Sequence, residues 1–147
     1  MTPQVRVHAF GDDALADHDA VALADLIRRG DLSAAEVESA AVERIQKVTP
    51  TLRAVVHEAY DRPRRSSDTG APLFGVPTLI KDNTDVAAWP TNNGSEAYTA
   101  RPAKKDGAYT RQFVGTGVTV LGKTRMPEFG LNATTEFRTQ EPTVNPW

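Results

Sequence analysis

The spacing of apolar and polar residues predicts helices in the first third of the chain. Residues 19–29 carry apolar side chains at helical spacing, and a glycine suited to ending a helix follows them. The next helix is predicted to begin with a capping box formed by Ser33 and Glu36, and Pro50 is expected to end it. We therefore predict a helical hairpin over residues 1–50, packed on the outside of a larger structure because both apolar stripes need a surface to cover.

A short strand and a polar loop are predicted to follow the hairpin. The strand is expected within residues 51–60, where the run LRAVVHE occurs. Residues 61–72 mix charge, serine, glycine and proline without periodicity, which is typical of a surface loop. Arginines in such a loop are usually solvated, so we do not interpret Arg62, Arg64 and Arg65 as a basic binding patch.

Residues 73–147 carry the pattern of a βαβ segment. Residues 76–80 form an apolar strand, Asp106 is suited to cap a helix, and the β-branched run at 118–121 predicts a second strand. This order of elements is typical of a parallel sheet and places the chain in the α/β class. Two such strands leave an unpaired edge, which indicates that further chain, or another chain, completes the sheet.

Composition narrows the classes of function. The chain has 147 residues, 39% of them hydrophobic, and a net charge of -2, so charge gives no reason to expect a nucleic-acid partner. Neither a membrane-spanning run nor the apolar core of a secretory signal is visible, so we expect a cytoplasmic protein without a membrane partner. The absence of cysteine excludes disulfides and thiolate chemistry, and the scattered histidines have no metal-ligand spacing. We predict no cofactor and no metal, and expect surface or structural roles for His8, His18 and His57.

One motif is rejected on its context. Gly117 to Thr124, GVTVLGKT, satisfies the spacing of a phosphate-binding loop. The stiff apolar residues inside it favour a strand, whereas the real motif curls between a strand and a long helix, and Pro127 follows too closely for that helix. We therefore expect Lys123 to be a structural or surface lysine at the end of a strand.

The stretch GVPTLIKDN is the candidate for catalysis, because its apolar strand runs directly into Lys81. In open parallel sheets, reacting groups gather beyond the carboxyl ends of the strands. Burial can lower the pKa of a lysine by several units and make it a neutral general base. Spacing alone favours a simpler interpretation, in which Lys81 extends into solvent and Asp82 caps a turn.

Several stretches together resemble the amidase signature family in order and approximate spacing: PLFGVPTLIKDN, TNNGSEAY, DGAYTRQFVGTGVTVLGKTRMPEFG and NPW. The resemblance covers nearly the whole chain. It implies a mixed β-sheet surrounded by helices, incomplete in this chain, and a serine hydrolase that acts through a serine, a second serine on a cis peptide bond and a lysine. By position the family's lysine is Lys81. The implied reaction converts a small-molecule carboxylic amide to an acid and ammonia or an amine.

The main departure of the chain from the family concerns the catalytic serines, and a smaller one is the lack of the glycine often found before the asparagine and proline of the NPW motif. No G-x-S-S-G-G run occurs in the chain, although the resemblance implies that both catalytic serines follow the NPW motif, which here ends at Trp147. Ser95 is expected to be structural or to line the site. We therefore interpret residues 1–147 as the N-terminal portion of a single amidase domain, inactive without a complementary C-terminal portion. The alternatives are a truncated, non-catalytic fragment or interaction unit, and a subunit of a transfer-RNA-dependent amidotransferase.

Overall fold

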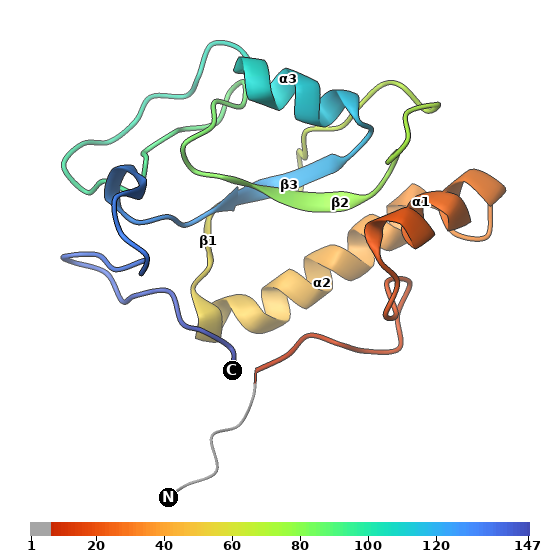
Figure 1. The fold of residues 1–147 in the computed structure, drawn as a ribbon, viewed down its shortest axis with the longest axis horizontal. Helices are drawn as coiled ribbons and strands as arrows, with labels where there is room; N and C mark the ends of the chain where they lie inside the picture. The colour runs from red at the N-terminus through yellow and green to blue at the C-terminus, as the bar shows by residue number, and fades with distance from the viewer. Residues whose placement is uncertain (1–6) are drawn as a thin grey trace, which may run out of the picture.

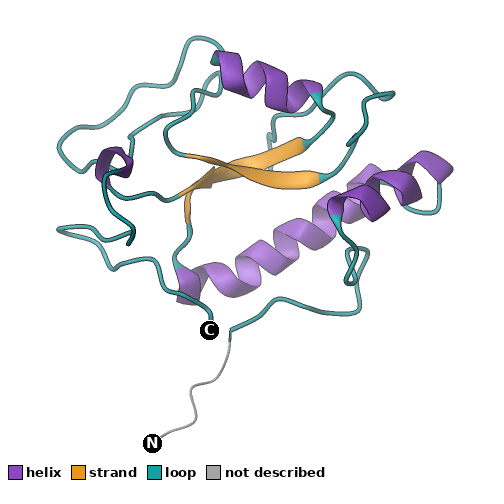
Figure 2. Ribbon diagram, in the orientation of Figure 1, coloured by secondary structure: helices purple, strands orange, loops and turns teal. Residues whose placement is uncertain are grey.

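The computed structural model describes residues 7–147, in which a small mixed sheet lies between two helical layers (Figure 1). Residues 1–6, which open both the predicted hairpin segment and the stretch searched for a secretory signal, lie outside the described part. Figure 2 shows that loops connect most of the helices and strands. The elements are α1 (Ala20–Arg29), α2 (Ala34–Leu52), β1 (Val55–Glu58), β2 (Pro77–Lys81), α3 (Ala108–Gly115), β3 (Thr119–Thr124) and the 3₁₀ turn η1 (Glu128–Gly130).

Strand β3 is the centre of the sheet, in the order β1-β3-β2. It pairs parallel to β2 and antiparallel to β1, so the α/β class and the mixed sheet are both confirmed. The parallel pair with α3 between its strands is the predicted strand, helix and strand arrangement. Within residues 7–147, β2 has a strand partner on one side only, so the sheet is incomplete along that edge.

The predicted starts of the first two helices are confirmed at their caps. Asp19 accepts a hydrogen bond from the Ala22 amide at 2.8 Å, and Gly30 ends α1 in the left-handed region with φ 79°. In the capping box of α2, the Glu36 amide donates to Ser33 Oγ at 3.2 Å and the Ser33 amide donates to Glu36 Oε2 at 2.8 Å. The predicted capping box at Ser33 and Glu36 is thus confirmed, and α1 begins within the range predicted from its apolar spacing.

The expectation that Pro50 ends the second helix was wrong. Helix α2 continues to Leu52 and ends where Arg53 adopts φ 52° and its amide donates to the Thr49 carbonyl at 2.8 Å. Proline removes one amide and crowds one carbonyl, so the two residues after it still complete the final turn. The later ending also shortens the predicted strand, and β1 begins only at Val55.

The predicted helix cap at Asp106 was also wrong. Helix α3 begins after Gly107, which makes no side-chain capping bond. The buried Asp106 carboxylate instead accepts from the Ala87 amide at 2.8 Å and from Arg64 Nε at 2.9 Å. Burial acts to raise the pKa of Asp106, but these two partners, together with the charge of Arg111, outweigh it and hold the pKa below the ordinary aspartate value.

The loop arginines had been expected to be solvated, but this is wrong for two of the three. Arg62 is highly exposed, whereas Arg64 binds the buried Asp106 and Arg65 forms an ion pair with Glu38 of α2 at 2.6 Å. The backbone of Arg64 also exchanges hydrogen bonds with Val120 of β3, both at 2.9 Å. The polar loop is therefore attached to the sheet and to a helix by its basic residues.

Two apolar clusters cover the opposite faces of the sheet (Figure 1). One joins the sheet to α3 and includes Ile80, Val114 and Val120; the other joins α1 and α2 to Val76. No helix among residues 7–147 is long and apolar enough to cross a membrane. The central strand β3 lies between the two clusters, which accounts for the burial of every residue from 119 to 123.

A bulge in β3 changes the register of the parallel pair. Thr78 pairs with Val120, but Ile80 pairs with Lys123, so β3 has one extra residue in this interval. Gly122 lies in it, and a Cβ atom at Gly122 would come within 2.2 Å of the His57 carbonyl oxygen in β1. Strand β3 also runs further than the predicted 118–121, and it fills the end of the rejected phosphate-binding motif, which confirms the predicted strand there.

Candidate active site

Lys81 is the last residue of β2 and lies at the carboxyl end of the parallel pair, as predicted. Its neighbours Ile80 and Asp82 are each 3% exposed, whereas Lys81 is exposed. This is the alternation of a strand, with Lys81 directed away from the side occupied by its neighbours. Among residues 7–147 its side chain forms no hydrogen bond and no ion pair.

A cavity of about 460 Å³ adjoins Lys81 and lies between the end of β2 and helix α3. Its α3 wall carries two stacked rings, Tyr109 and Phe113, whose centroids are 5.5 Å apart. The cavity offers an amine beside an apolar surface, a composition suited to small organic molecules. It is lined by Leu79, Ile80, Lys81, Asn83, Thr84, Tyr109 and Phe113.

The second lysine, Lys123, has the opposite environment. Its side chain is 0% exposed, and its ammonium donates to the Pro90 carbonyl at 2.6 Å, to Thr91 Oγ1 at 2.7 Å and to Asp82 Oδ1 at 3.4 Å. Burial lowers the pKa of Lys123, and the Asp82 charge opposes that shift. A structural lysine at this strand end was one of two expectations and is what the structure has, whereas the surface alternative was wrong.

The simpler interpretation predicted that Asp82 caps the turn after β2, and this was wrong. The backbone closes that turn, with the Thr84 amide donating to the Lys81 carbonyl at 3.2 Å. The Asp82 carboxylate is buried and accepts from the Asn92 amide at 3.3 Å and from Lys123. Asp82 therefore connects the end of β2 to β3 and to the segment around residue 92.

Ser95 is buried and bound in a way that suits the structural or site-lining role expected for it. Its hydroxyl donates to Glu128 Oε1 at 2.6 Å and accepts from the Ala97 amide at 3.2 Å. It also lines a cavity of about 260 Å³ together with His57 and Arg125. No lysine or histidine bonds to its oxygen among the described residues, so nothing there activates Ser95 as a nucleophile.

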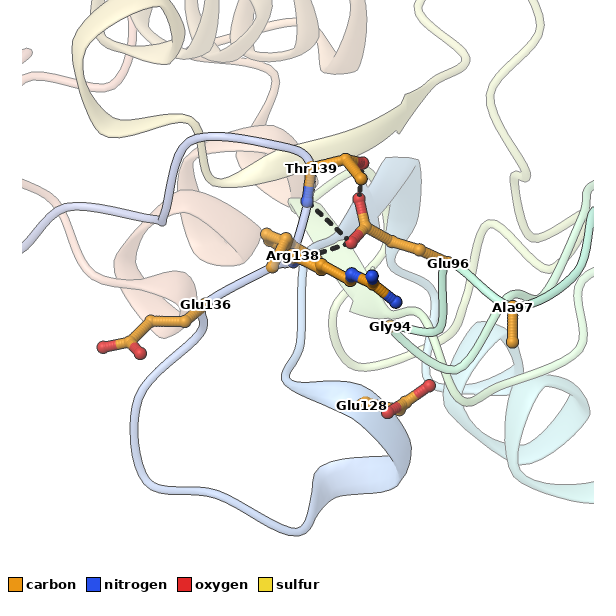
Figure 3. A pocket seen from close by; sticks show the side chains of 8 residues that line it. Gly94, Glu96, Ala97, Glu128, Glu136, Arg138 and Thr139 are labelled. Atoms are coloured by element: carbon orange, nitrogen blue, oxygen red, sulfur yellow. Dashed lines mark hydrogen bonds between the residues drawn. The ribbon is translucent and has the colours of Figure 1, made fainter.

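A further cavity of about 490 Å³ lies near the end of the chain, and Glu96, Glu128, Glu136 and Arg138 are among the residues that line it (Figure 3). Glu96 reaches across to the C-terminal segment and accepts hydrogen bonds from the Arg138 amide at 2.7 Å, from the Thr139 amide at 3.0 Å and from the Thr139 hydroxyl. The Thr139 hydroxyl above all lowers the pKa of Glu96. Its carboxylate is thus engaged in attaching the C-terminal segment to the loop that begins near residue 92.

The histidines occupy separate places in the described structure. His57 lies against Trp89 with ring centroids 5.1 Å apart, and burial, then the charge of Lys123, lowers the pKa of His57. His8 stacks on Phe10 at 6.0 Å. Residues 7–147 contain no group of three or more histidine, aspartate or glutamate residues arranged to hold a metal ion.

The sequence did not reveal the pairing of Lys123 with Asp82. One signal was available, because Lys123 continues a run of β-branched and apolar residues in a strand expected to be buried. A lysine in such a strand needs buried partners, and an acidic residue at a neighbouring strand end is one group that can neutralise its charge. Identifying Asp82 as that partner required the register of β2 against β3, including its bulge.

Comparisons with known proteins agree with this arrangement. A family model described as Amidase matches residues 36–147. The putative amidase AmiC of Mycobacterium leprae is 50% identical over 144 residues, which cover 97% of this chain and 31% of that protein. One of the subunits of the glutamyl-tRNA(Gln) amidotransferase of Salinispora arenicola is 34% identical over 143 residues, covering 90% of this chain and 29% of that protein.

Solved structures give the same family. The structure of 6-aminohexanoate cyclic dimer hydrolase superposes with a TM-score of 0.75 and 28% sequence identity, over 88% of this chain and 28% of that one. The chain thus spans 31% of the length of the first relative above and similar shares of the others. With a family model over residues 36–147, and relatives of the same family in both sequence and structure, this chain belongs to the amidase family.

Proposed function

We propose that this chain contributes the general base, Lys81, to an amidase that hydrolyses a small-molecule carboxylic amide to an acid and ammonia or an amine. The observation that carries the proposal is the environment of Lys81: an exposed amine, without a partner among residues 7–147, at the carboxyl end of a parallel strand and beside a cavity. A lysine with no structural partner is available to a reacting group.

The proposed chemistry is acyl transfer through a serine, a second serine on a cis peptide bond, and Lys81. Neutral Lys81 accepts a proton from the bridging serine, which takes one from the nucleophilic serine as its oxygen attacks the amide carbonyl. The amine departs with a proton returned through the same relay, and water then opens the acyl-enzyme. Backbone amides of a glycine-rich loop stabilise the oxyanion, each contributing typically about 3 kcal/mol.

The proposal requires both serines to come from a portion outside these 147 residues. No G-x-S-S-G-G run occurs in the sequence, and the chain spans 31% of the length of its relative from Mycobacterium leprae. That portion would also cover the cavity beside β2 and exclude water from the surroundings of Lys81. By itself, the 147-residue chain is expected to be inactive, because a base without its nucleophile contributes little to acyl transfer.

The experiment is complementation. This chain is combined with the serine-bearing portion, and hydrolysis of small amides such as p-nitroacetanilide and benzamide is measured, with each part alone as the blank. We expect activity only in the combination and its loss in Lys81→Ala. The matched control is Lys105→Ala, because Lys105 is also exposed but lies away from the strand ends. Full activity in Lys81→Ala would overturn the assignment of the base.

A second candidate function is membership of a transfer-RNA-dependent amidotransferase complex, favoured by the 34% identity to the amidotransferase component from Salinispora arenicola. In such a complex the chain would help release ammonia from an amide for transfer to a mischarged transfer RNA. Amide hydrolysis that rises on addition of glutamyl-tRNA and partner subunits would favour this candidate. Hydrolysis that is complete without them favours the free amidase, and a combination that hydrolyses no amide favours a non-catalytic interaction unit.

A further inference from the structure

We propose that the buried pair of Lys123 and Asp82 positions Lys81. The pair acts through the backbone of Asp82, which directly follows Lys81 in the chain. The inference rests on the proposed role of Lys81 as the base. It starts from an observation that this role leaves unexplained, which is a completely buried lysine at the neighbouring strand end.

Asp82, the residue after Lys81, is held at every polar group it has. Its amide donates to the Thr124 carbonyl at 3.2 Å, and its carbonyl accepts from the Asn93 amide at 2.9 Å. Its carboxylate accepts from the Asn92 amide at 3.3 Å and from Lys123 at 3.4 Å. A residue anchored on both its backbone and its side chain fixes the direction of the chain that precedes it.

Lys123 completes this anchor with all of its donors. An ammonium has three N–H groups, and Lys123 has three acceptors: Asp82, the Pro90 carbonyl and the Thr91 hydroxyl. The acceptors belong to two segments other than β3, so a single side chain joins the end of β2 and the segment at residues 90–91 to the central strand. The ion pair itself is buried, with the side chains of Lys123 and Asp82 0% and 4% exposed.

The bulge in β3 is what brings Lys123 to the correct side. Paired residues of adjacent strands share a face, and the extra residue in β3 makes Lys123 the partner of Ile80. Ile80 and Asp82 lie two apart on β2 and therefore face the same way. Without the bulge, Lys123 would fall on the opposite face from Asp82.

The consequence for Lys81 is a defined exit from the sheet. Lys81 pairs with Thr124, and its carbonyl accepts from the Thr84 amide at 3.2 Å. Ile80 and Asp82 are buried on one side, so the side chain of Lys81 is directed to the other side, where it is exposed; it also lines the cavity at the end of β2. A slip of one residue at the end of β2 would exchange Lys81 and Asp82 between the two faces.

Stability alone is a weak reason for such a pair. Replacing a buried ion pair with well-packed apolar residues is often neutral or stabilising, so its presence points to a requirement for geometry. Because Asp82 is one residue from the proposed base, the geometry that we infer to be required is the placement of Lys81.

The test is a cycle of variants in the active amidase, formed by this chain and its serine-bearing portion. Lys123→Met and Asp82→Asn are each combined with Lys81→Ala, and kcat and KM are measured with p-nitroacetanilide, or with p-nitrophenyl acetate for residual rates. We expect each single variant to lower kcat by about 10- to 100-fold through misplacement of the base, with KM within about twofold. In the Lys81→Ala background we expect no further loss.

The outcomes separate this inference from the function on which it rests. An equal loss in both backgrounds would mean that the pair supports the structure generally, and would overturn the inference while leaving Lys81 as the base. Full activity of Lys81→Ala itself would overturn both. If Lys123→Met fails to fold, Thr91→Val decides in the same cycle: it removes one acceptor of Lys123 and keeps the ion pair, and it should lower kcat severalfold only where Lys81 is present.

Discussion

Lys81 is the last residue of β2 and Lys123 the last but one of the parallel strand β3, and their positions differ by a single step in register, since Lys81 pairs with Thr124 and Ile80 pairs with Lys123. One side chain is exposed beside a cavity without a partner among residues 7–147, and the other is 0% exposed with three acceptors. The same amine at the same level of the sheet therefore has two uses. Whether a lysine is available for chemistry depends on which face of the strand it occupies and on what packs against that face.

The largest expected effect is the loss of activity, with little loss of stability, when the exposed Lys81 is replaced. In the assembled amidase, Lys81→Met should lower kcat by about 10⁴-fold or more, because removing the base disables the whole relay. In the 147-residue chain by itself, the free energy of unfolding should change by no more than about 0.5 kcal/mol, since the lost side chain is exposed and has no hydrogen bond or ion pair among residues 7–147. Steady-state kinetics and urea unfolding measure the two, with Lys105→Met as the surface control. A large loss of stability would contradict the comparison.

The same substitution at the buried Lys123 should act mainly on stability. Lys123→Met should lower the free energy of unfolding by about 3–5 kcal/mol, because it leaves the Asp82 charge buried without its partner. Urea unfolding measures the change. The double variant Lys123→Met/Asp82→Asn should be more stable than Lys123→Met, since a neutral amide keeps an acceptor for the Asn92 amide. Equal stability of the two variants would mean that the charge of Asp82 is not the cause.

A smaller effect is expected where the bulge approaches β1. In Gly122→Ala, the added methyl group would meet the His57 carbonyl oxygen at 2.2 Å, so the strands must separate, at a cost of about 1–3 kcal/mol in unfolding free energy. Gly115→Ala is the matched control, because nothing lies within 4 Å of its added Cβ and it ends helix α3. Hydrogen exchange of the Asn92 amide should also accelerate in Gly122→Ala only. Equal stability of both variants would mean that the close approach of Gly122 to the His57 carbonyl does not limit stability.

The smallest effect is a dependence on alkaline pH. Burial lowers the pKa of Lys123 in the folded protein below its ordinary value of 10.5. Between these two values the unfolded chain binds more protons, so stability should rise as the pH increases through that window, by at most about 1.4 kcal/mol per pH unit. Urea unfolding at several alkaline pH values should show this rise in the protein and in Lys81→Met, and not in Lys123→Met. An identical pH dependence in Lys123→Met would assign the rise to other groups.

Much of the local structure could be predicted from the sequence, because its causes are local. The capping box of Ser33 and Glu36 needs only neighbouring residues, and the apolar run at 76–80 makes a strand under most surroundings. The errors occurred where distant partners compete with local preferences. Asp106 had the composition of a helix cap but is bound by Arg64 and Ala87, which are respectively 42 and 19 residues away in the chain.

The candidate site divides in the same way. The sequence by itself determined the family resemblance, the parallel strand pair and the place of Lys81 at the end of its strand, because motif order and strand pattern are properties of the chain read in one direction. Only the tertiary structure decided that Lys123 is buried, that Asp82 is its partner and that Lys81 is exposed beside a cavity. Those outcomes depend on the register of β2 against β3, which a bulge shifts by one residue, and a shift of one residue exchanges the two faces of a strand.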